Sequence, residues 1–129
     1  MKSIIFDCDN TMGPYGKDVN DGLALLYLLG KKEVDLTGVT TRFGNSTIED
    51  VYKNTVGMFH ELNINYIPLK KGAASTDNRQ SEAAEFLVEM VNSMSKEITI
   101  LATGSLTNLY GAYEIDKSFF KKVKEIILI

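Results

Sequence analysis

Short apolar runs alternate with longer amphipathic segments along the whole chain, and this alternation restricts the possible fold more than any other feature. Strand-like runs cover residues 3–6, 34–41, 65–69, 98–101 and 125–129. Helix-like segments cover residues 21–29, 46–62, 81–94 and 106–115. Strands that alternate with helices form parallel sheets with both faces covered, through right-handed crossovers. The sequence therefore predicts an α/β, Rossmann-like parallel sheet with helices on both faces.

Two of the predicted helices begin with a capping signal. Ser46 is followed three residues later by Glu49, which is a capping-box pattern, and Ser81 directly precedes the third helical segment. The helix after Ser46 carries one stripe of residues at helical spacing, which is typical of a helix packed on a sheet. This stripe consists of Ile48, Val51, Tyr52, Thr55, Phe59 and Leu62.

The last apolar run, residues 126–129, contains only Ile and Leu and shows no polar alternation. Such a run is typical of a buried strand. We therefore expect one domain, residues 1–129, whose sheet is cut after the fifth strand. Because an apolar strand at an open sheet edge favours pairing, a homo-oligomer or association through this edge is also expected.

Charge, apolar runs and cysteine content exclude several classes of function. The formal net charge is -3, whereas nucleic-acid binding requires clustered Lys and Arg. The longest apolar run, residues 23–29, is too short to cross a bilayer, and no signal peptide is evident. A single cysteine, Cys8, suits a reducing compartment and a buried packing role. We expect a cytoplasmic protein that binds neither nucleic acid nor membrane.

Polar residues follow the predicted strands at the points where the strands end. Because ligands of parallel sheets bind at the carboxyl ends of the strands, near a reversal of strand order, these residues are expected at one edge. They are Asp7 and Asp9 after the first strand, then residues 40–45, 70–72 and 103–105 after the next three.

Carboxylates dominate this predicted edge. Strand alternation places Asp7 and Asp9 on the same side, and Asp18 and Asp21 follow closely. Three or four carboxylates would repel one another without a cation, and oxygen ligands favour Ca²⁺ or Mg²⁺. In the alternative interpretation, Asp18, Asn20 and Asp21 only begin the helix.

Three sequence blocks resemble nucleoside hydrolases of the inosine-uridine preferring type. Asp7-Cys8-Asp9 followed by Asp21-Gly22-Leu23-Ala24-Leu25 resembles their aspartate-rich N-terminal signature. Residues 38–45, Gly-Val-Thr-Thr-Arg-Phe-Gly-Asn, resemble the second-strand motif, and residues 102–108, Ala-Thr-Gly-Ser-Leu-Thr-Asn, the fourth-strand turn. Residues 122–128 also match, so the resemblance spans essentially the whole chain.

The resemblance implies hydrolysis of the N-glycosidic bond of ribonucleosides to free base and ribose, with a calcium cofactor. By position, Asp9 would bind calcium and help to activate the attacking water. Asp21 would be a second carboxylate ligand, and Thr103 would offer its backbone carbonyl. Calcium suits this role because its flexible coordination accommodates water and sugar hydroxyls together.

The same resemblance assigns roles to three further residues. Asn20 and Asn45 would contact the ribose, and Asp7 would orient the calcium ligands from behind. Asn20 stands where the family normally has an aspartate, so weaker ribose binding is expected because one acceptor oxygen becomes a donor. The link of residues 10–19 is also longer than in the family signature, which leaves the alignment of Asp18 open.

The resemblance also predicts that the site is incomplete in this chain. Family members are more than twice as long, and their later half supplies another aspartate ligand and a histidine beside it. The only histidine here, His60, lies within the predicted second helix and is expected to be a surface or packing residue. Residues 72–80 form a polar loop that is either a lid over substrate or an ordinary exposed loop.

Two other functions compete with hydrolysis of nucleosides. The run Asp7-Cys8-Asp9-Asn10-Thr11 resembles the opening of haloacid-dehalogenase-type phosphatases, in which Asp7 would be the nucleophile, Asp9 the acid-base and magnesium the cofactor. Thr103 would then imitate the phosphate-binding residue, but the later lysine and acidic pair of that family are not in place. The other alternative is an inactive fragment that binds a metal or a protein partner.

Overall fold

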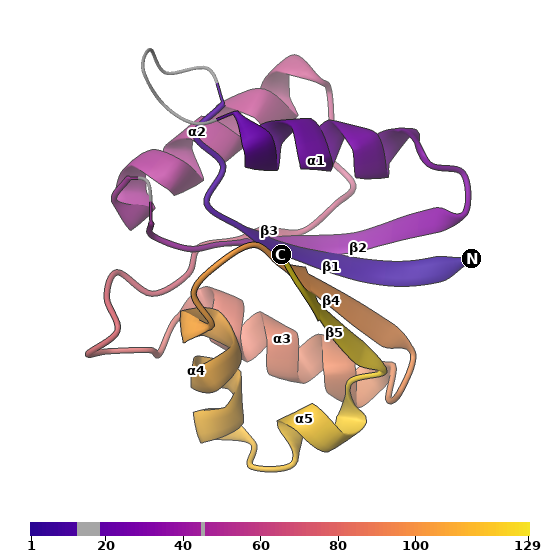
Figure 1. Cartoon of the computed structure of the whole chain (residues 1–129), viewed down its shortest axis with the longest axis vertical. Coiled ribbons are helices and arrows are strands. Elements are labelled where there is room, and N and C mark those ends of the chain that lie inside the picture. The colour runs from indigo at the N-terminus through magenta and orange to yellow at the C-terminus, as the bar shows by residue number, and fades with distance from the viewer. Residues whose placement is uncertain (13–18, 45) are drawn as a thin grey trace.

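A single parallel sheet forms the centre of the molecule, with the strand order β3-β2-β1-β4-β5 (Figure 1). The computed structural model describes residues 1–12, 19–44 and 46–129. The strands are β1 (Lys2–Cys8), β2 (Val34–Thr41), β3 (Leu69–Lys70), β4 (Ile98–Ala102) and β5 (Glu125–Leu128). The helices are α1 (Asn20–Gly30), α2 (Ile48–Glu61), α3 (Glu82–Ser93), α4 (Thr107–Ile115) and α5 (Phe119–Lys122). The predicted α/β architecture is therefore confirmed.

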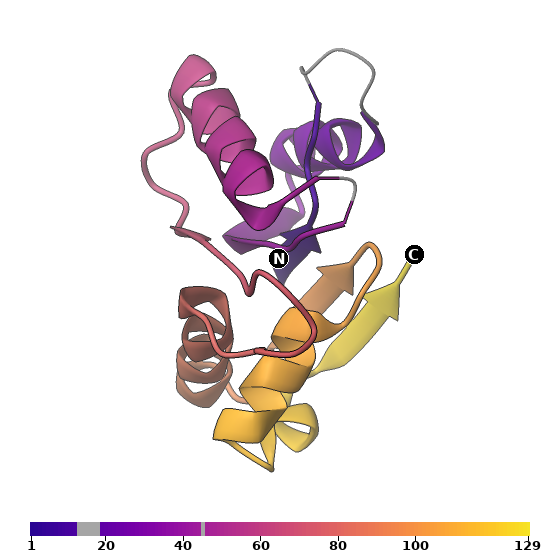
Figure 2. The ribbon, with the colours of Figure 1, turned by 90° about the vertical axis from the view of Figure 1, so that its left-hand side faces the viewer.

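The sheet separates two hydrophobic cores, one under each layer of helices (Figure 2). Side chains of β1 alternate between them, as expected for a strand buried on both faces. Phe6 packs with Leu25 of α1 and Phe59 of α2, whereas Ile5 packs with Leu87 of α3 and Leu109 of α4. Within the described ranges, none of the helices is long and apolar enough to cross a membrane.

The helix starts agree with the predicted capping signals in one case and differ in the other. The Ser81 hydroxyl accepts a hydrogen bond from the Ala84 N–H at 3.1 Å, which confirms the cap of α3. At α2 the cap is Thr47, whose hydroxyl accepts from the Asp50 N–H at 3.3 Å, so the prediction of Ser46 was wrong by one residue. Thr47 and Asp50 repeat the same spacing, and in the helix that starts at Ile48 this side chain is buried.

The third strand is shorter than predicted. Only Leu69 and Lys70 pair with β2, whereas the sequence pattern indicated residues 65–69. Pro68 has no N–H to donate to a ladder, and its carbonyl instead accepts from the Val39 N–H at 2.9 Å. The short helix α5 was not predicted.

The predicted last strand forms and pairs with β4, but it is not buried. Ile127 is 41% exposed and Leu128 is 60% exposed, because β5 is the outer strand of the sheet. Only Ile126 packs against the core beneath α3 to α5. The expectation that this run is buried is therefore wrong for the chain as it stands, and β5 presents an apolar edge.

Candidate functional site

The candidate residues meet where the strand order reverses, at the carboxyl edge of the sheet. β2 and β4 flank β1 on either side, so their carboxyl ends lie next to Asp9. The Arg42 N–H donates to the Cys8 carbonyl at 2.9 Å, and the Thr103 N–H donates to the Asp7 carbonyl at 3.2 Å. These two bonds continue the ladders past the strand ends. They bring Asp9, Arg42 and Thr103 together from three different strands.

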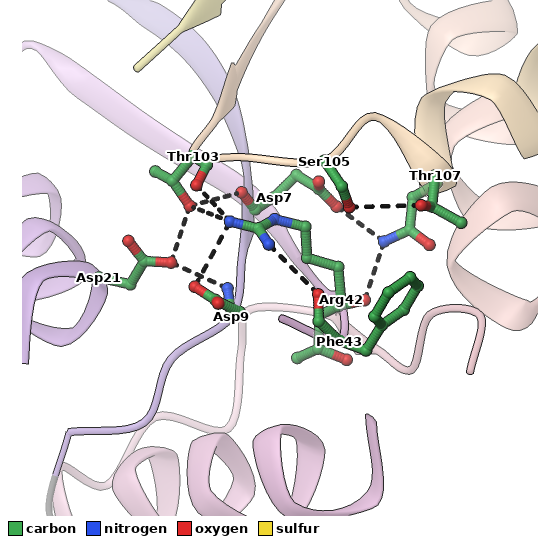
Figure 3. A network of polar contacts seen from close by, with 10 residues as sticks. Asp7, Asp9, Asp21, Arg42, Phe43, Thr103, Ser105 and Thr107 are labelled. Carbon is green, nitrogen blue, oxygen red and sulfur yellow. Dashed lines mark hydrogen bonds and ion pairs between the residues drawn. The ribbon is translucent and has the colours of Figure 1, made fainter. Parts of the chain in front are cut away.

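Asp21 joins this group from the first turn of α1 (Figure 3). Its Oδ2 atom accepts a hydrogen bond from the Asp9 N–H at 2.9 Å and another from the Thr103 hydroxyl at 2.7 Å. Burial raises the pKa of Asp21 to about 6, and the Asp9 side chain adds to the rise, whereas the two hydrogen bonds oppose it. The structure thus brings together the three residues predicted to bind a metal: Asp9, Asp21 and Thr103.

The guanidinium of Arg42 lies among these same groups (Figure 3). Its Nη2 atom donates to the Thr103 carbonyl, to the Thr103 hydroxyl at 3.2 Å and to Asp9 Oδ1 at 3.4 Å. Both members of the Arg42–Asp9 ion pair are buried, with side-chain exposures of 5% and 9%. A buried carboxylate requires such a partner, so Arg42 balances the charge of Asp9.

Two glycines allow the guanidinium to lie this close to the backbone. A Cβ atom on Gly104 would overlap the Arg42 guanidinium, and one on Gly44 would overlap the Asp9 carboxylate. Gly104 also has a φ of +156°, which side chains disfavour. Both glycines belong to the second-strand and fourth-strand blocks of the sequence.

Asp7 lies close by but faces a different set of partners. Its Oδ1 atom accepts from the Thr40 hydroxyl at 2.6 Å and from Asn108 Nδ2 at 2.8 Å. Burial raises its pKa, and these two hydrogen bonds oppose the rise. β1 ends at Cys8, so the regular alternation on which the prediction for Asp7 and Asp9 rests stops before Asp9. Asp7 contacts the candidate ligand Thr103 through its backbone carbonyl, which accepts from the Thr103 N–H at 3.2 Å.

The donor set suits calcium in its chemistry but differs from the predicted one. Two carboxylates and one backbone carbonyl are hard oxygen donors, which calcium prefers. The expected group of three or four carboxylates is not found: across the described ranges, no three His, Cys, Asp or Glu side chains are grouped so that they could hold a metal. Asp18 lies outside the described residues.

The remaining predicted residues are placed as follows. Asn20 is the first residue of α1 and is exposed, and Asn45 lies outside the described residues. Cys8 is fully buried in the core under α1 and α2, which confirms its packing role. His60 is exposed in the last turn of α2.

Comparison with known proteins decides the family. A sequence model of the inosine-uridine preferring nucleoside hydrolase family matches residues 4–129. The chain belongs to this family.

Individual relatives agree with that assignment. Uridine nucleosidase 1 of Arabidopsis thaliana is 29% identical over 86% of this chain and 41% of its own length. The inosine-uridine preferring nucleoside hydrolase of Crithidia fasciculata is 26% identical over 99% of this chain and 48% of its own length. The solved structure of the plant nucleoside hydrolase PpNRh1 superposes with a TM-score of 0.85 at 27% identity, over 98% of this chain and 47% of that one. The chain thus spans about half the length of these nucleoside hydrolases.

Membership of the nucleoside hydrolase family leaves the phosphatase alternative without support. That alternative requires Asp7 as a nucleophile, yet Asp7 is 0% exposed and its Oδ1 atom already accepts two hydrogen bonds. A nucleophile must reach its substrate, so the position of Asp7 does not suit this role.

Sequence reasoning missed two residues that organise the site in this family member. Arg42 and Asn108 lie inside the quoted motif blocks, but neither was given a role. Arg42 directly follows a buried strand, at the same sheet edge where Asp9 follows its own strand. This position is the signal that could have identified Arg42. Asn108 lies in the first turn of a predicted helix, which gives no comparable signal. Its partners, Asp7 and Thr41, belong to strands distant in the sequence.

Proposed function

We propose that this chain carries the calcium-binding part of a site that hydrolyses the N-glycosidic bond of ribonucleosides to free base and ribose. The observation that carries the proposal is the meeting of Asp9, Asp21 and Thr103 at the reversal of strand order. Ligands of open parallel sheets bind at this place. Family membership over residues 4–129 supports the reaction class.

Each residue of the group would have a distinct role. The Asp9 and Asp21 carboxylates and the Thr103 carbonyl would hold calcium, and Asp9 would also accept the proton of the water that attacks the ribose. Asn20, exposed at the start of α1, would donate a hydrogen bond to a ribose hydroxyl, and Asn45 would share that task. Asp7 would fix Thr103 through its backbone carbonyl. When bound, calcium would supply positive charge that polarises the water and orients the sugar hydroxyls.

The site is proposed to be only part of the complete hydrolase site. Departure of the base is assisted in such reactions by a proton donor, and among the described residues the single histidine, His60, is exposed in the last turn of α2 and is not part of the group formed by Asp9, Asp21 and Thr103. The relatives named above include a uridine nucleosidase and an inosine-uridine preferring nucleoside hydrolase. Inosine and uridine are therefore the two substrates with which to test the chain.

The test is release of ribose from inosine and from uridine, with calcium and with a chelator, by the chain and two matched variants. Asp9→Asn removes the proposed proton acceptor and should lower the rate by about 100-fold or more. Asp35→Asn makes the same substitution at an exposed residue near the opposite end of β2 and should leave the rate unchanged. Equal rates for wild type and Asp9→Asn would refute the role of Asp9. No release by any form would refute autonomous hydrolysis by this chain.

A further inference from the structure

Arg42 already contacts two of the three groups proposed to hold calcium. Its Nη2 atom donates to the Thr103 carbonyl and to Asp9 Oδ1, the latter at 3.4 Å (Figure 3). A backbone carbonyl and a carboxylate oxygen cannot bind a guanidinium and a divalent ion in the same place. Two cations within a few ångströms also repel each other strongly in a buried site. The contacts of Arg42 and those of calcium therefore compete.

The backbone of Arg42 is fixed, so any exchange must occur in its side chain. The Arg42 N–H bonds the Cys8 carbonyl at 2.9 Å, which holds the residue at the end of β2. The guanidinium lies beside Gly44 and Gly104, both exposed and without side chains. A Cβ atom on either glycine would overlap the guanidinium, so the guanidinium lies against exposed backbone with no side chain of these two residues in between.

The guanidinium is also incompletely satisfied where it lies. Its Nε atom is buried and finds no hydrogen-bond partner in the part of the chain that the structure describes. Leaving a buried donor unpaired has a cost in free energy, which makes it less unfavourable to replace Arg42 by a cation of higher charge. Arg42 thus binds two of the proposed calcium ligands, but one of its own donors remains unpaired in this position.

We propose that Arg42 is an internal cation that competes with calcium for Asp9 and Thr103, so that calcium binds only when the guanidinium swings out. This inference rests on the proposed function, because it concerns the same calcium site. It makes Arg42 a positioning residue that sets the calcium affinity of the site and stabilises Asp9 when calcium is scarce.

Calorimetric titration of the metal-free chain with calcium tests the competition. Arg42→Gln removes the charge and keeps a hydrogen-bond donor for the Thr103 carbonyl, and calcium should bind it roughly tenfold more tightly or better. Arg79→Gln is the matched control: Arg79 is exposed and pairs with Glu114 at 2.8 Å, so the same loss of charge should leave the affinity unchanged. Equal affinities of wild type and Arg42→Gln would overturn the inference but leave the calcium site standing. Absence of binding in every form would refute the calcium site itself and the inference with it.

A second measurement needs no change at Arg42 and remains decisive if Arg42→Gln does not fold. The chain contains two arginines, Arg42 and Arg79, so a proton–nitrogen NMR spectrum holds two Nε–H signals. Comparison with Arg79→Gln assigns them. Saturating calcium should move the Arg42 signal and leave the Arg79 signal in place. Calcium binding with both signals unmoved would overturn the inference.

Discussion

Asn108 provides the sharpest test of how the carboxyl edge of the sheet is held together, because one side chain joins four parts of the chain. From α4, its Nδ2 atom donates to Asp7 Oδ1 of β1 and to the Thr41 carbonyl of β2, both at 2.8 Å. Its Oδ1 atom accepts from the Ala73 N–H at 3.3 Å. The side chain is fully buried, so water cannot replace these bonds at low cost.

The expected cost of Asn108→Ala follows from these three contacts. A hydrogen bond to a charged group contributes about 1.5 to 3 kcal/mol, and each neutral bond about 0.5 to 1.5 kcal/mol. The sum is roughly 2.5 to 6 kcal/mol, which is a large part of the 5 to 15 kcal/mol typical of whole domains. With an m-value of about 2 kcal/mol/M, the midpoint of urea unfolding should fall by roughly 2 M.

Urea unfolding followed by circular dichroism measures this loss, and Asn92→Ala supplies the matched control. Asn92 is an exposed residue of α3 whose Oδ1 atom accepts from Lys122 Nζ at 2.8 Å. The same substitution there should change the free energy of unfolding by no more than about 0.5 kcal/mol. A loss below about 1 kcal/mol for Asn108→Ala, with the m-value unchanged, would refute the reasoning that this side chain joins the strand ends.

Two further predictions concern helices and acid stability. Gly57 in α2 has open space around its missing Cβ, whereas a Cβ on Gly111 in α4 would overlap the Arg79 carbonyl. In urea unfolding, Gly57→Ala should therefore raise the free energy of unfolding by about 0.5 to 1 kcal/mol, and Gly111→Ala should lower it by about 1 to 3 kcal/mol. A gain in stability for both variants would contradict the packing of α4. Lys122 and Ser118 lower the pKa of Asp116 from 3.8 to about 2, so the ionised carboxylate stabilises the fold above pH 3.8 and loses this effect as the pH falls toward 2. Asp116→Asn should accordingly lower the melting temperature at pH 7, and a difference from wild type that persists unchanged at pH 2 would contradict that origin.

The fold could be predicted from the sequence wherever local pattern and global topology agree. The strand of residues 34–41 matches β2 at both ends, and Ser81 caps α3 as its position indicates. The sequence pattern gave wrong strand lengths or burial where the pairing of strands in the sheet determines them. Pro68 removes a donor and shortens β3, and the apolar run after Glu125 reads as buried although β5 lies at the edge of the sheet.

The candidate site could likewise be predicted from the sequence only in part. Asp9, Asp21 and Thr103 could be predicted to meet, since topology alone brings the carboxyl ends of β1 and β4 next to the start of α1. Asp7 could not be separated from them by alternation, because the strand ends one residue after it. Its actual partners, Thr40 and Asn108, come from another strand and another helix. No local pattern reports contacts between such distant segments.

The carboxylates at this sheet edge predict a compensating positive charge, but that prediction does not say where the charge comes from. A buried carboxylate at a sheet edge requires compensating positive charge whether or not a ligand is present. A free ion supplies that charge only at sufficient concentration, whereas an arginine in the same chain supplies it always. Arg42 meets the requirement at Asp9 with an ion pair of 3.4 Å. A chain in which Arg42 neutralises Asp9 should fold without calcium and should bind calcium only when the Arg42 side chain is displaced. The measured calcium affinity therefore reflects the free-energy cost of displacing Arg42 as well as the strength of the oxygen donors.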